Sequence, residues 1–136
     1  MAATALVDTG FLIALLDARD AHHRWAMAMA KRQPPPWTTC EAVLSEAFHI
    51  LGPRDAESLA TLLRRGAVAT LFRFDQSIET VLILMHKYAD VPMSFADACL
   101  VRMTEMLPDP LLLTTDTDFR IYRRHSRQTV PCVVPE

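Results

Sequence analysis

The chain has 136 residues, of which 51% are hydrophobic and 22% are charged, and its formal net charge is −2. This length suits one compact domain, so we expect a single domain spanning residues 1–136. The hydrophobic content argues against a disordered chain. The slightly negative charge argues against binding nucleic acid through overall charge alone, so contact with RNA or DNA would need local basic patches or bound cations.

The cysteines and the absence of targeting segments indicate the cellular compartment of the protein. The chain has three widely spaced cysteines, Cys40, Cys99 and Cys132, and no pair has the spacing of metal ligands. Reduced thiols in the cytoplasm are therefore expected. Residues 1–4 lack the basic segment of a secretion signal, and no apolar stretch reaches the roughly 20 residues of a membrane span. We expect a soluble cytoplasmic protein without a membrane partner.

The first part of the chain predicts a buried strand followed at once by a helix. Residues 5–7 are apolar and end at Asp8, after which helical periodicity runs through Leu12 and Leu16. A second helix is predicted over 21–32, and the prolines that follow end it before a short extended piece over 37–39.

The middle of the chain predicts two helices and a strand. Thr38 and Glu41 have the spacing of a capping box, with Thr38 as the N-cap of a helix that ends at Gly52. A further helix is predicted over 54–66, with Gly66 as its C-cap, and β-branched and aromatic residues predict a strand over 68–74.

The last part of the chain adds two helices, a buried strand and a basic segment. Helices are predicted from 75 to about 88 and from Ser94 onward, and an apolar strand over 111–114. A short basic helix is expected over 120–124, and a last strand over 130–134, interrupted by a proline.

The alternation of strands and helices defines the fold class. Strands separated by helices form parallel sheets that are covered on both faces. We therefore predict an α/β fold, a three-layer α/β/α sandwich with a central mostly parallel sheet of 4–5 strands.

Four acidic residues are candidates for a shared site. Asp8 and Asp116 each end a predicted strand, Asp97 lies in the first turn of a helix, and Glu46 lies within another helix. The carboxyl ends of parallel strands meet at one edge of a sheet, where open α/β sheets bind ligands. Each acid also has a purely structural explanation: Asp8 and Asp116 as N-caps, Asp97 in a capping box behind Ser94, and Glu46 as an exposed helix residue.

Carboxylates that converge on one site need a cation. They repel one another, and burial disfavours their charged forms. Oxygen ligands of this kind suit Mg²⁺ or Mn²⁺. A bound divalent ion lowers the pKa of a water and shields phosphate oxygens, as metal-assisted phosphodiester hydrolysis requires.

Taken together, four segments resemble the PIN-domain ribonucleases of the VapC toxin family, which act in type II toxin–antitoxin systems. The segments are V-D-T-G-F-L at 7–12, V-L-S-E-A at 43–47, S-F-A-D-A-C-L at 94–100 and T-T-D-T-D-F at 114–119. The resemblance covers nearly the whole chain and implies a PIN-like fold. It also implies a metal-dependent endoribonuclease that hydrolyses RNA phosphodiester bonds with a metal-activated water.

The resemblance also implies roles for individual residues. It implies that the metal-binding and catalytic residues are Asp8, Glu46, Asp97 and Asp116, and that the cofactor is Mg²⁺ or Mn²⁺. Asp118 is expected either as a fifth acid of the site or, in a supporting role, as a helix-start residue that holds the turn of Asp116. Thr9 and Thr114 are expected to support the site by orienting its carboxylates. The resemblance further implies a homodimer and a cognate antitoxin that packs near the early helices.

A basic cluster follows the last of these acids. It contains Arg120, Arg123 and Arg124, and it is interpreted either as a solvated helix face or as a contact for the RNA backbone.

Two other functions remain open. One is a non-catalytic PIN-like module that binds RNA or protein, although such modules are expected to lack some of the four acids. The other is a nuclease for flapped or branched DNA, which usually needs helical additions for which 136 residues leave no room.

Overall fold

The computed structural model describes residues 3–136, so Met1 and Ala2, on which part of the argument about a secretion signal depends, lie outside the described residues. The strands are β1 (Thr4–Val7), β2 (Trp37–Thr38), β3 (Val68–Ala69), β4 (Pro110–Leu113), β5 (Arg123–Arg124), β6 (Gln128–Thr129) and β7 (Cys132–Val133). The helices are α1 (Thr9–Leu16), α2 (His23–Arg32), α3 (Glu41–Ile50), α4 (Pro53–Arg64), α5 (Ile78–Lys87) and α6 (Phe95–Glu105), with short 3-10 turns η1 (Phe74–Gln76) and η2 (Thr117–Arg120).

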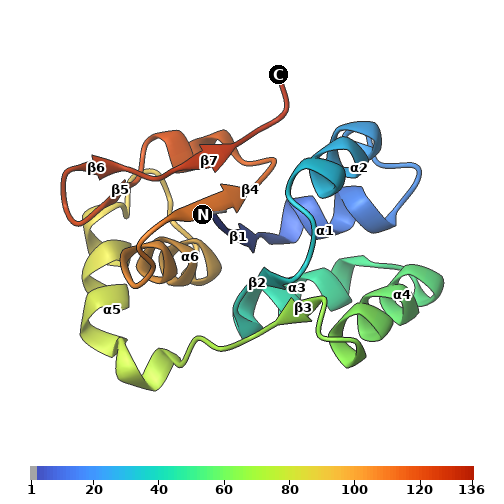
Figure 1. Ribbon diagram of the computed structural model, residues 1–136. Helices are drawn as coiled ribbons and strands as arrows, with labels where there is room; N and C mark the ends of the chain where they lie inside the picture. Colours follow the sequence, from blue (N-terminus) through green and yellow to red (C-terminus); the bar gives the residue numbers. More distant parts are fainter. Residues whose placement is uncertain (1–2) are drawn as a thin grey trace.

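A five-stranded parallel sheet forms the centre of the molecule (Figure 1). Its strand order is β3-β2-β1-β4-β7, and every neighbouring pair is parallel. The chain builds outward from β1 to β3, then returns to place β4 on the other side of β1. The strand order therefore reverses between β1 and β4, and ligands of open α/β sheets bind at such a reversal, beyond the carboxyl ends of the strands.

The helices fall into two groups that cover the sheet. Helix α1 contacts α2, α3 and α4, whereas α6 contacts α5 and β4 and also meets α3. Figure 1 shows α5 and α6 on one side of β1 and β4, and α1, α2 and α4 on the other. Apolar residues of β1 and β4, such as Leu6 and Leu112, are fully buried and pair in register. The predicted three-layer α/β/α sandwich is confirmed, and its central sheet has five strands, all parallel.

The predicted capping box at the start of α3 is wrong. Thr38 pairs in β2, and the N-cap of α3 is Cys40, which makes no side-chain capping hydrogen bond. Thr38 belongs to the sheet because strand pairing continues past it: the N–H of the next residue, Thr39, donates to the carbonyl of Ala69. The pairing of parallel strands thus outweighs a local capping preference.

Two further predicted elements differ from the structure. The strand expected over 68–74 is limited to Val68–Ala69, and Leu71 is 83% exposed where the chain leaves the sheet. The basic helix expected over 120–124 is instead the 3-10 turn η2 followed by β5, which pairs with β6 as an antiparallel hairpin. Within residues 3–136, no helix is long and apolar enough to cross a membrane.

Candidate carboxylate site

Asp8 lies where β1 passes into α1. Its side chain caps the helix by accepting a hydrogen bond from the N–H of Phe11 at 2.9 Å, and it also accepts one from the hydroxyl of Thr114. Only 7% of the residue is exposed. Burial raises the pKa of Asp8 to about 6, and the nearby charges of Asp116 and Asp97 add to the rise.

Asp116 reaches the same edge from the neighbouring strand. Val7 pairs with Leu113, so the residues that follow these two strands come side by side. The fully buried hydroxyl of Thr114 joins the two acids, because it donates to Asp8 and accepts from the N–H of Asp116 at 2.9 Å. The Asp116 carboxylate then accepts from the N–H of Asp118 at 2.8 Å, which starts η2.

Asp97 enters the site from the first turn of α6. The predicted capping box is present: the hydroxyl of Ser94 accepts from the N–H of Asp97, and the Asp97 carboxylate accepts from the N–H of Ser94. The hydroxyl of Tyr122 donates to the same carboxylate oxygen at 3.2 Å. Partial burial raises the pKa of Asp97, and the charge of Asp116 contributes.

Tyr122 is a residue of the site that the sequence did not single out. Its ring is fully buried against those of Phe119 and Tyr88. Burial, followed by the charge of Asp97, raises the pKa of Tyr122, so its hydroxyl remains a donor at neutral pH. The only sequence signal for it is an aromatic residue three positions after the Asp-Phe pair, which is not specific.

Glu46 is the exposed member of the group. It lies on α3, and its carboxylate accepts a hydrogen bond from the hydroxyl of Thr9 at 3.0 Å. Thr9 is the first residue of α1, directly after Asp8. The hydroxyl of Thr9 therefore ties α3 to the start of α1.

These four acids line one pocket of about 130 Å³. Its lining residues are Asp8, Thr9, Gly10, Val43, Glu46, Ala96, Asp97, Leu100, Thr115 and Asp116. Asp118 is not among them, although its N–H holds the Asp116 carboxylate in place. The structure thus brings Asp8, Glu46, Asp97 and Asp116 together from β1, α3, α6 and the segment after β4.

The donor set of this pocket fits a hard divalent cation. Its charged lining groups are all carboxylates, and Mg²⁺ or Mn²⁺ prefers such oxygen ligands. Within the part of the chain that the structure describes, no three His, Cys, Asp or Glu side chains are grouped so that they could hold one ion. Each carboxylate instead accepts hydrogen bonds from its own neighbours, and binding an ion would require some of these bonds to be exchanged.

The arginines of the basic cluster are largely engaged with the protein's own backbone. The guanidinium of Arg123 donates to the carbonyls of Arg120, Ile121 and Tyr122. The guanidinium of Arg124 donates to carbonyls at the end of α6, those of Thr104 and Leu107.

This engagement has a structural consequence for the cluster. Arg124 adds a charged donor to carbonyl groups at the end of α6, where a helix leaves backbone acceptors short of partners. Arg120 is more exposed and lies 3.7 Å from the carboxylate of Glu136. Of the predicted RNA contacts, Arg120 is therefore the one least committed to holding the fold.

The fold and the pocket define a class of protein: a parallel α/β sheet whose strand-order reversal holds a cluster of carboxylates. The profile of the PIN domain matches residues 5–124. The chain belongs to the PIN domain family, as its sequence motifs predict.

Solved structures include a relative of the same fold. The crystal structure of VapC20 from Mycobacterium tuberculosis, a toxin that cleaves the sarcin–ricin loop, superposes with a TM-score of 0.70 at 23% sequence identity. The match covers 80% of this chain and 87% of VapC20. No curated protein matches the chain significantly.

Proposed function

We propose that the protein is a metal-dependent endoribonuclease, the toxin of a type II toxin–antitoxin pair of the VapC family. The observation that carries this proposal is the convergence of Asp8, Glu46, Asp97 and Asp116 on one pocket at the reversal of the sheet. Structural roles explain each acid singly, but they do not require four acids from distant segments to share a pocket. Membership of the PIN family and the shared fold with a ribonuclease toxin support the same function.

In the proposed reaction, some residues of the site bind the metal ion and others orient its ligands. Asp8, Asp97 and Asp116 would hold Mg²⁺ or Mn²⁺, with Glu46 as a direct or water-mediated ligand. Such an ion, when bound, supplies an acidified water and shields the phosphate oxygens. Thr114 and Tyr122 orient the carboxylates of Asp8 and Asp97 through their hydroxyls.

Glu46 is suited to take the proton of the attacking water. It is exposed, and within residues 3–136 the one side chain that binds its carboxylate is Thr9, which leaves further lone pairs free. A general base needs to lie within hydrogen-bond reach of the proton that it removes. Because Glu46 is exposed and lines the pocket, whereas Asp8 is buried, we assign the role of general base to Glu46.

The proposed substrate is a structured RNA. The matched toxin cleaves the sarcin–ricin loop, and hairpins of this kind are therefore the first substrates to test. Arg120, the exposed last residue of η2, is the proposed contact for the RNA backbone. The three cysteines are free thiols, consistent with the proposed location in the cytoplasm.

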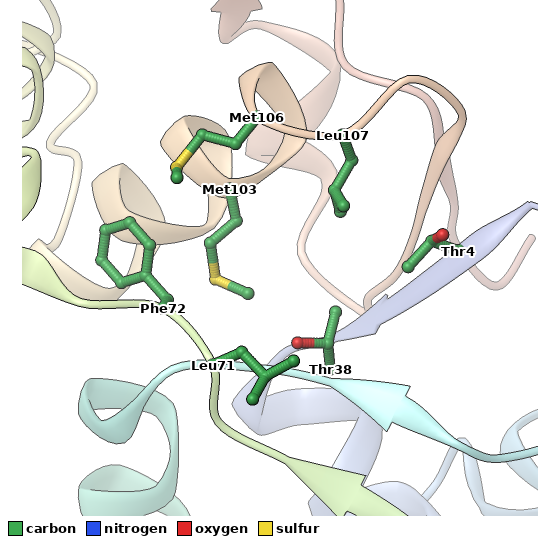
Figure 2. Close-up of a pocket in the computed structure, with 7 residues that line it drawn as sticks. All are labelled: Thr4, Thr38, Leu71, Phe72, Met103, Met106 and Leu107. Carbon is green, nitrogen blue, oxygen red and sulfur yellow. The ribbon is translucent and has the colours of Figure 1, made fainter.

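Exposed apolar groups support the proposed homodimer and antitoxin. A second pocket, of about 240 Å³, lies between the end of α6 and the segment after β3, lined mainly by apolar side chains such as Phe72, Met103 and Leu107 (Figure 2). Leu71 at its edge is 83% exposed, and Ile83 on α5 is 63% exposed. We assign the surface around this second pocket to the homodimer and the early helices to the antitoxin. Light scattering of the purified chain tests the first assignment.

The test of the proposed function is RNA cleavage with matched variants. The protein is incubated with a labelled sarcin–ricin hairpin and with other structured RNAs, in Mg²⁺, in Mn²⁺ and in EDTA. We expect cleavage only with a divalent ion, its loss in Asp8→Asn, and its retention in Asp90→Asn, which changes an exposed acid outside the pocket. Cleavage that persists in Asp8→Asn or in EDTA would contradict the proposal.

A second candidate is a non-catalytic module that binds RNA or protein. The specific observation in its favour is that the carboxylates within residues 3–136 do not yet form a ligand set for one ion. Titration calorimetry separates the two functions. RNA binding without any measurable affinity for Mn²⁺ would favour the module.

A further inference from the structure

Thr115 carries a hydroxyl group that the proposed mechanism has not used. The residue lies between Thr114 and Asp116 and lines the carboxylate pocket. The hydroxyls of the two other threonines at the site bind protein groups: Thr9 donates to Glu46, and Thr114 donates to Asp8. For Thr115, no hydrogen-bond partner is found among residues 3–136. Its hydroxyl is therefore free to bind a ligand in the pocket.

Gly10 makes room for this hydroxyl. A Cβ atom at Gly10 would overlap Oγ1 of Thr115 and would lie 3.6 Å from Oδ1 of Asp8. The φ angle of Gly10 does not require glycine, because the residue lies in the first turn of α1. The absence of a side chain at position 10 thus serves to admit the Thr115 side chain beside Asp8.

The charge of the pocket explains what such a donor would bind. The pocket's other polar side chains are four carboxylates, which repel an RNA phosphate, and Thr9, which is already bound to Glu46. A hydrogen-bond donor beside the cation would stabilise a phosphate group in this pocket, because hydrogen bonds to charged oxygens are strong. The geometry assigns this role to Thr115: we propose that its hydroxyl donates a hydrogen bond to a non-bridging oxygen of the RNA phosphate. This inference rests on the proposed ribonuclease function.

Substituting Thr115 tests the contact directly. Thr115→Val keeps the shape of the side chain and removes the donor. Because the contact is present in the bound ground state and in the transition state alike, KM should rise about tenfold, the magnitude typical of a hydrogen bond to a charged group, with kcat nearly unchanged. Thr115→Ser, which restores the hydroxyl, should recover most of the loss. The matched control Thr117→Val changes an exposed threonine outside the pocket and should behave as wild type.

A binding measurement gives a readout that is independent of cleavage. In an Asp8→Asn background, the anisotropy of a labelled mixed-sequence RNA oligonucleotide reports affinity. Adding Thr115→Val should weaken binding by a similar factor without changing the dependence on salt concentration, because a neutral donor releases no counterions. Substituting Arg120, in contrast, should reduce the salt dependence.

Gly10→Ala moves the Thr115 hydroxyl without deleting it. In the wild-type background it should raise KM as Thr115→Val does. In a Thr115→Ala background its further effect should be much smaller, because the Oγ1 that it displaces is already gone and only the 3.3 Å approach to Cβ of residue 115 remains. Additive effects of the two substitutions would overturn the pairing of Gly10 with Thr115.

The outcomes separate this inference from the function on which it depends. A wild-type protein without metal-dependent cleavage would refute the ribonuclease itself. Cleavage by the wild type with an unchanged KM in Thr115→Val, or with Thr115→Ser as impaired as Thr115→Val, would refute only the phosphate contact. A fall in kcat at constant KM would also refute it, because the hydroxyl would then act on the carboxylates rather than on the substrate.

Discussion

Replacing Asp8 with asparagine is expected to stabilise the metal-free protein at neutral pH. The side chain is 7% exposed, and burial raises its pKa from the ordinary value of 3.8 to about 6. A pKa difference of one unit between the folded and unfolded states corresponds to about 1.4 kcal/mol. Ionised Asp8 therefore lowers the free energy of unfolding at pH 7 by about 3 kcal/mol relative to its protonated form.

The sign of the pH dependence follows from the raised pKa. The folded state binds the proton more tightly than the unfolded state, so the stabilising contribution is complete below pH 4 and is lost as the pH rises through about 6. Asparagine does not titrate and should remove this part of the pH dependence. Its amide oxygen can still accept from the N–H of Phe11, and its amide group can donate to Thr114, so the cap of α1 remains.

Urea unfolding in EDTA at pH 4, 5.5 and 7 measures the effect. The difference in stability between Asp8→Asn and wild type should grow with pH, approaching about 3 kcal/mol at pH 7. Asp90→Asn serves as the control and should show no such trend. A difference that stays constant with pH, or an Asp8→Asn protein that is less stable than wild type at pH 7, would refute the reasoning.

Adding a divalent ion at pH 7 should reverse the order of stability. A ligand that binds only the folded state at 1,000 times its Kd stabilises it by about 4.1 kcal/mol, which exceeds the advantage of about 3 kcal/mol expected for Asp8→Asn. Mn²⁺ should therefore raise the unfolding midpoint of wild type far more than that of Asp8→Asn. Equal effects on both proteins would show that the ion binds elsewhere.

Three other substitutions test features outside the Asp8 carboxylate. Tyr122→Phe removes the hydroxyl that holds Asp97 and should lower kcat about tenfold while the fold is kept, measured by cleavage and by circular dichroism. Gly66→Ala should cost about 1 kcal/mol in urea unfolding, because φ at Gly66 is +74°, whereas Gly52→Ala, at a negative φ, should cost less. Arg124→Met should destabilise the fold by about 1 to 3 kcal/mol, since carbonyls at the end of α6 lose their donor, and an unchanged urea midpoint would contradict this role.

The predictable part of the fold is the part specified by hydrophobic runs. The apolar segments around Leu6 and Leu112 indicate buried strands, and Asp8 and Asp116 mark where those strands end. Because parallel strands share one carboxyl edge, the meeting of these two acids followed from the fold class. The approach of Asp97 and Glu46 followed only from the resemblance, since helix packing around the edge is not encoded in local periodicity.

The parts that were mispredicted depend on contacts between distant residues. Thr38 has the local features of an N-cap, but pairing with Leu6 places it in a strand. The basic residues around Arg124 have the composition of a helix, but the guanidinium group of Arg124 binds distant carbonyls at the end of α6, and the segment forms a hairpin there. Local sequence patterns do not indicate a role for Tyr122, because that role depends on Asp97, which lies 25 residues away in the sequence.

The hydrogen bond between Thr114 and Asp8 joins residues that are 106 positions apart. A growing polypeptide thus lacks this half of the pocket until β4 has left the ribosome and inserted beside β1. For a protein proposed to cut RNA, incomplete translation products would be harmless to the machinery that makes them. Proteolytic loss of the segment after α6 would remove Asp116 and Thr114, and with them the proposed ribonuclease activity.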